Sequence, residues 1–161
     1  MADYPVRTIM TPPLPDEALS LAERLLFDMM FESSPAEDGG RFFFAGTTPT
    51  FEGELDSALV ASAIAISPPG IARTLLEAVQ DRSAPTVPID IAGDWERLLQ
   101  DIVRREAALT HIVVVTAFIS TTIRADGFGG AATVITAEAI DSLSTFDFVE
   151  TVLAARLSVK T

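Results

Sequence analysis

The sequence predicts an α+β protein in which several amphipathic helices pack on a small, mainly antiparallel sheet. Apolar residues recur at helical spacing in several segments, most clearly in GDWERLLQDIVRREAAL at 93–109. Two stretches rich in β-branched residues, 112–123 and 131–137, are expected to pair as a C-terminal β-hairpin, which a terminal helix follows. The alternation of helices and strands also permits a mixed sheet.

The N-terminal third of the chain predicts an arm, a helix and a strand. Residues 1–15 hold four prolines and are expected to form an extended arm, with a single globular domain over 16–161. Apolar spacing predicts a helix over 16–32, which the turn residues of 33–40 end. The run RFFFAG at 41–46 then predicts a short strand.

The middle of the chain predicts more helices and one edge strand. Helices are expected over 54–66 and 70–82, because the intervening prolines fit only the first turn of a helix. An internal proline makes 87–91 a plausible edge strand rather than a central one. Ser144 and Asp147 form the looser capping-box pattern S-x-x-D before the terminal helix.

Composition limits the class of protein. A chain of 161 residues is expected to fold as one domain, since single cores are commonest near about 100–150 residues. It contains no cysteine, which excludes disulfides, thiolate chemistry and cysteine-ligated zinc and fits a reducing cytoplasm. No targeting pattern is visible at the N-terminus, and the apolar runs are shorter than the ~20 residues that span a bilayer. We therefore expect a soluble, cytoplasmic protein.

The net charge argues against two classes of partner, whereas the hydropathy predicts a large core or an apolar interface. The net charge of −12, from 23 acidic and 11 basic side chains, repels phosphate backbones and anionic lipid, so we expect neither nucleic acid nor membrane as a partner. Mimicry of DNA would need the carboxylates gathered on one face, whereas they are scattered singly along the chain. Hydrophobic residues make up 48% of the chain, which predicts a large core or an apolar surface that meets a partner.

The glycine-containing segment TTIRADGFGGAATVIT is interpreted as a hairpin. Gly127, Gly129 and Ala132 match a loose dinucleotide-binding fingerprint, but that chemistry needs a helix to begin at the loop, and AATVIT is a β-type run. The pair Asp126-Gly127 is a hairpin signal. We expect residues 124–130 to form the loop, with Gly127, Gly129 or Gly130 at positive φ.

No residue is assigned a catalytic, cofactor or metal role. One histidine and no cysteine leave carboxylates as the metal ligands, and no EF-hand spacing appears. His111 is interpreted as a helix-end residue that complements the helix dipole, with a catalytic role as the alternative. Phe128 is expected at the hairpin tip, folded on the sheet or offered to a partner, where Arg124 and Asp126 could form a polar pair.

Other charged side chains have structural interpretations. Arg104 and Arg105 lie off the apolar stripe of their helix and are expected on a solvated face. The acidic residues Glu32, Glu37 and Asp38 are read as a charged surface loop, although paired carboxylates also perform acid–base chemistry.

The functional expectation is a non-enzymatic protein that self-associates, as a homodimer, or binds a protein partner. The alternative is a small-molecule-binding protein or enzyme with a site between helices and sheet near His111. Candidate interface residues are Phe42–Phe44, Phe128 and the apolar face of helix 16–32. Because successive strand residues face opposite sides of a sheet, Phe43 must point away from Phe42 and Phe44, so both faces of that strand need cover.

Overall fold

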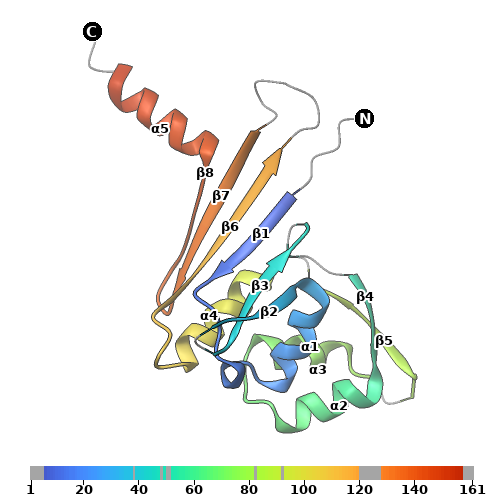
Figure 1. Ribbon diagram of the computed structural model, residues 1–161. Helices are drawn as coiled ribbons and strands as arrows, with labels where there is room; N and C mark the ends of the chain where they lie inside the picture. Colours follow the sequence, from blue (N-terminus) through green and yellow to red (C-terminus); the bar gives the residue numbers. More distant parts are fainter. Residues whose placement is uncertain are drawn as a thin grey trace.

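The structure is a computed structural model that describes residues 6–37, 39–47, 49, 52–81, 83–91, 93–119 and 128–157. Its helices are the short 3-10 helix η1 (Asp16–Ala18), α1 (Leu21–Met30), α2 (Ser57–Ile66), α3 (Ile71–Val79), α4 (Trp95–Arg105) and α5 (Thr145–Leu157). Its strands are β1 (Val6–Thr11), β2 (Glu32–Pro35), β3 (Arg41–Ala45), β4 (Glu52–Asp56), β5 (Thr86–Asp90), β6 (His111–Ile119), β7 (Phe128–Thr136) and β8 (Ile140–Ser144). The α+β fold class is confirmed, including a β7–β8 hairpin followed by a terminal helix (Figure 1).

Six strands form one sheet in the order β2-β3-β1-β6-β7-β8, and every neighbouring pair is antiparallel. Strands β4 and β5 form a separate two-stranded sheet. Residues 6–11, which we expected in an extended arm, instead form β1 in the interior of the large sheet. Their pairing with β6 joins residues more than a hundred positions apart, and no local pattern in a proline-rich segment reveals such a partner.

The predicted hairpin pairing is confirmed, but two of its glycines act differently from the prediction. Ile112 pairs with Ile135, as the two β-branched runs indicate. Residues 120–127, with Arg124, Asp126 and Gly127, lie outside the described residues. Gly129 and Gly130 are strand residues of β7 without positive φ.

The physical reason for glycine at position 129 is a close approach by an aromatic ring. A Cβ atom there would collide with the ring of Phe118, its cross-strand partner. Positive φ occurs instead at Gly39 and Gly40, between β2 and β3, and at Gly93 before α4.

The predicted helices and two of the strands are present with shifted ends. The run RFFFA forms β3, and the expected edge strand near 87–91 forms β5. The segment expected to open the second helix forms β4, and Asp56 caps α2 with its side chain. Strands β2, β4 and β8 were not predicted, because their short, polar sequences carry no strand pattern of their own and acquire strand geometry only by pairing with another strand.

Helices α1 and α4 cover one face of the large sheet, here called the inner face. Phe43 on β3 is buried there against Phe27 of α1, with ring centroids 5.1 Å apart in an edge-on arrangement. Phe42 and Phe44 lie on the opposite face and are partly exposed, which confirms the predicted alternation. On the inner face of β6 and β7, Ile112 and Ile135 are fully buried against the helical layer.

Arg105 corrects the expectation of a solvated arginine pair. Its guanidinium reaches from α4 to α1, where it contacts both carboxylate oxygens of Glu23 at 2.9 and 2.6 Å and donates to the carbonyl of Ala18 at 2.7 Å. Glu23 is only 2% exposed, so this pair joins the two helices inside the protein. Arg104 keeps a half-exposed side chain, which donates to the carbonyl of Ala137.

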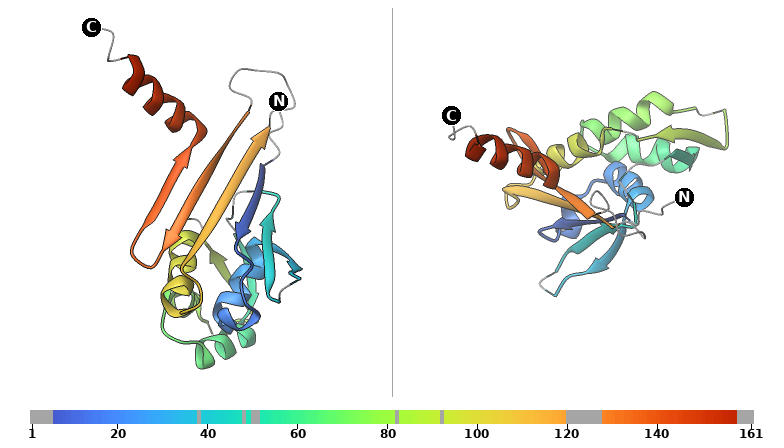
Figure 2. Two further views of the ribbon diagram at one scale, coloured as in Figure 1. Left: turned by 60° about the vertical axis from the view of Figure 1, so that its left-hand side comes forward. Right: turned by 90° about the horizontal axis from the view of Figure 1, so that it is seen from above.

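The far half of the large sheet extends beyond the helical layer. Figures 1 and 2 show α1 to α4 gathered around one end, while β6, β7 and β8 continue past them and α5 projects from the end of β8. Ser144 and Asp147 form the predicted capping box at the start of α5, with Ser144 Oγ donating to the carboxylate at 2.6 Å.

Candidate functional site

The candidate residues from the sequence do not converge on one site. His111 begins β6 and Phe128 begins β7, and the antiparallel register places them at opposite ends of this pair. Eight residues of strand separate those ends, which corresponds to roughly 27 Å. The other two candidates, Arg124 and Asp126, lie outside the described residues.

His111 does not have the helix-end role expected for it. Helix α4 ends at Arg105, and His111 is an exposed strand residue. Its Nδ1 atom lies 2.9 Å from the hydroxyl of Thr110, its neighbour in sequence. This contact is local and does not place the imidazole between the helices and the sheet.

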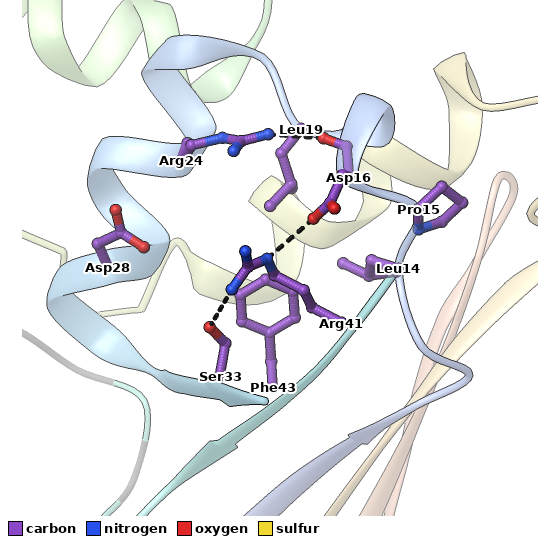
Figure 3. A pocket seen from close by; sticks show the side chains of 9 residues that line it. All are labelled: Leu14, Pro15, Asp16, Leu19, Arg24, Asp28, Ser33, Arg41 and Phe43. Atoms are coloured by element: carbon purple, nitrogen blue, oxygen red, sulfur yellow. Dashed lines mark hydrogen bonds and ion pairs between the residues drawn. The ribbon is translucent and has the colours of Figure 1, made fainter. Parts of the chain in front are cut away.

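A small polar cavity lies between η1, α1 and the β2–β3 hairpin (Figure 3). Its volume is about 190 Å³, and its lining includes two arginines and two aspartates. Arg41 donates to the carboxylate of Asp16 at 2.9 Å and to Ser33 at 3.4 Å, and Arg24 donates to the carbonyl of Asp16 at 2.6 Å. Asp28 lies on the same side of the cavity as Arg24 (Figure 3).

This cavity is better explained as a structural polar contact than as a binding site. Both arginines already donate to the protein, and their charges are balanced by the two aspartates. The volume is also below the roughly 300 Å³ at which pockets for small molecules begin. Within the described part of the chain, no cluster of three or more His, Asp or Glu side chains could hold a metal ion.

The face of the large sheet opposite α1 and α4, here called the outer face, is the most extensive candidate surface. Every second residue of the central strands points to it, and none of these residues is buried. The buried residues of these strands all lie on the inner face, namely Thr8, Met10, Ile112, Val114, Thr133 and Ile135. Its exposed large apolar side chains are Ile9, Val115, Ile119, Phe128, Val134 and Leu143. Phe128 belongs to this face, where it pairs with Ile119 at the far end of the strands.

Five apolar residues of the outer face form a straight row across the sheet, here called the apolar row. The register pairs Phe44 with Ile9, Ile9 with Val115, Val115 with Ala132 and Ala132 with Leu143. Glu32 continues the row on β2. Two shallow hollows of about 500 and 370 Å³ flank its centre and share Val115 and Ala117, so the face is a continuous trough.

Helix α5 is a second exposed apolar surface. Its side chains Phe146, Phe148, Val149, Val152 and Leu153 are each between 40% and 57% exposed. Only its first turns meet the sheet: Phe146 stacks on Phe118 with centroids 6.4 Å apart, and Phe148 borders the trough beside Leu143. An α-helix whose large apolar side chains cover about half of its circumference is normally packed against other parts of a protein.

The sequence contained a signal for this surface that its interpretation did not use. In IVVVTAFI the residues of both faces are apolar, which is typical of a strand covered on both sides. The structure covers only one side of that strand.

No protein-family model, curated protein or solved structure matches this chain. None of the described helices combines the length and the apolar character needed to cross a bilayer. The surface must therefore be interpreted from its own geometry.

Proposed function

We propose that the protein is a non-enzymatic, self-associating module that forms a homodimer in the cytoplasm. The observation that carries this proposal is the continuous apolar surface formed by the outer face and α5. A monomer in water rarely exposes a contiguous apolar patch above a few hundred Å², and larger patches are typical of interaction sites. The lack of cysteine supports a reducing compartment.

The size of this surface fits a dimer. The large apolar side chains of the outer face and α5 are each about half exposed. Taken together, they offer on the order of 800 Å² per copy, which is what a standard interface takes from each partner. Soluble oligomers are most often two-fold homodimers, in which one surface of this kind is used twice.

The alternative of an enzyme or small-molecule site near His111 has less support. His111 is exposed and contacts its sequence neighbour. The small cavity near Arg41 lies on a different part of the fold and consists of side chains that satisfy one another.

The mass in solution tests the proposal. Sedimentation or light scattering at tens of micromolar should give twice the chain mass of 17.2 kDa. Because the interface is largely apolar, the dimer should persist at high salt, where surface ion pairs are screened. A mass of one chain at that concentration would contradict self-association.

A further inference from the structure

We propose that α5 of one copy lies along the apolar row of a second copy, and that α5 of the second copy lies in the same way along the row of the first. This reciprocal contact about a two-fold axis is here called the α5 exchange. This inference rests on the proposed self-association and specifies the surfaces that meet. The occupant of the trough is thus a named helix of the partner subunit.

Helix α5 does not cover the row of its own chain, where Val115 and Leu143 are 42% and 50% exposed. Strand β8 ends at Ser144 and α5 begins at Thr145, so no linker residue separates them. The capping box between Ser144 and Asp147 further defines this junction. Figures 1 and 2 show α5 leading away from the sheet, which presents it to another molecule.

The distribution of residues around α5 requires a concave receptor. At 100° per residue, Phe146, Val149 and Leu153 form one strip, and Phe148 and Val152 widen it to about half of the circumference. A flat surface would leave part of this arc in water. The trough on the outer face, with hollows on both sides of Val115, offers the shape that such a helix needs.

The dimensions of the helix and the row agree. The 13 residues of α5 span about 20 Å at ~1.5 Å per residue. The apolar row crosses from β3 to β8, four inter-strand spacings of about 4.8 Å, or roughly 19 Å. One helix of this length therefore covers the row from end to end.

The charges at the edges of the two surfaces are complementary. Glu150 and Arg156 flank the central strip of α5 on opposite sides and lie about 9 Å apart along the helix axis. On the outer face, Glu32 ends the row on β2, and Arg7 lies two strands away on β1, about 10 Å distant across the sheet. With the C-terminal end of α5 over β3, where the row ends, the long side chain of Arg156 reaches Glu32 on the adjacent strand β2, and the side chain of Arg7 reaches Glu150.

A charge-reversal cycle tests this orientation. Arg156→Glu and Glu32→Arg should each raise the dimer dissociation constant about tenfold or more, since each places like charges together. The double variant should return it close to that of the wild type. Glu138→Arg, which reverses an exposed carboxylate in the turn between β7 and β8, is the matched control and should leave the constant unchanged.

Cysteine cross-linking tests the contact itself, and the absence of native cysteine makes the result clear. Copies carrying Val149→Cys and copies carrying Val115→Cys are mixed and oxidised, because Val149 lies over β6 when Arg156 lies over β3. A disulfide between the two kinds of copy is expected, whereas Ile66→Cys on α2, 73% exposed, should give none with Val115→Cys.

The outcomes separate the two proposals. A wild-type monomer at tens of micromolar would overturn both. A wild-type dimer with no Val149–Val115 cross-link, and with unchanged dissociation constants in the charge variants, would overturn the α5 exchange and leave self-association in place. A cross-link formed within one chain carrying both cysteines, at monomer mass, would also overturn the exchange.

Discussion

The carboxylate of Asp101, on α4, accepts a hydrogen bond at 2.6 Å from the backbone amide of Ile71, the first residue of α3. Gly70 occupies the N-cap position of α3 and has no side chain that could accept this bond. A similar contact joins α2 to α1, where Ser67 Oγ accepts the amide of Ala22 at 2.9 Å. Helices distant in sequence thus satisfy one another's free backbone amides.

Replacement of Asp101 by alanine should destabilise the protein by about 1 kcal/mol, the typical value of an N-cap interaction. Asp101→Asn keeps an oxygen acceptor at the same place and should lose less. Urea unfolding measured by circular dichroism gives both values. Equal losses in the two variants would show that the acceptor oxygen is not the source of the stability.

Arg105→Ala should destabilise the protein more strongly, by about 3 kcal/mol, because it leaves the carboxylate of Glu23 buried without its partner. The same unfolding experiment measures the loss. Arg97→Ala on the same helix is the control, since Arg97 is 63% exposed and lies 3.4 Å from Asp94. Its effect should stay below about 0.5 kcal/mol. Similar effects of the two substitutions would contradict a structural role for the Glu23 pair.

Alanine substitutions of Phe43 and Phe42 should differ sharply in their effect on stability, although the two residues are adjacent. Phe43→Ala removes a buried ring that packs on Phe27 and should cost about 3–5 kcal/mol. Phe42 lies on the outer face, away from the apolar row, and its replacement by alanine should cost about 1 kcal/mol or less. Chemical unfolding of the two variants decides this. A larger loss of stability for Phe42→Ala would mean that Phe42, and not Phe43, points to the inner face.

The stability of the junction between β8 and α5 should depend on pH through the carboxyl group of Asp147. Hydrogen bonds from the side chain and backbone of Ser144 hold the pKa of Asp147 below the usual value for aspartate. The ionised carboxylate therefore stabilises the junction above about pH 4, the pKa of an unfolded aspartate, and this contribution is lost as the pH falls through the lowered pKa.

An NMR titration of the Asp147 carboxyl group should show this lowered pKa, and Ser144→Ala should raise it toward the usual value. Asp81, whose pKa is lowered by the side chain and backbone of Ser83, is an internal control that Ser144→Ala should leave unchanged. An unchanged Asp147 pKa in Ser144→Ala would contradict the capping box.

The helices were predictable because their signals are local. The Trp95–Arg105 helix has its apolar stripe within one segment, and the Ser144–Asp147 capping box needs only residues three apart. The β6–β7 pairing was predictable for a similar reason, since its two β-branched runs are close in sequence. Strand β1 was not predictable, because its strand geometry depends on pairing with β3 and β6 across the fold.

The sequence by itself determined the α+β class, the positions of the main helices and the opposite orientations of Phe42 and Phe43. These follow from the periodicities of helices and strands, which act between near neighbours. Only the tertiary structure decided that Arg105 meets Glu23, that β1 lies inside the sheet, and that the apolar row stays uncovered while α5 points away from it. Each of these depends on which distant segments meet, and a pattern along the chain indicates that a face is apolar without indicating what covers it.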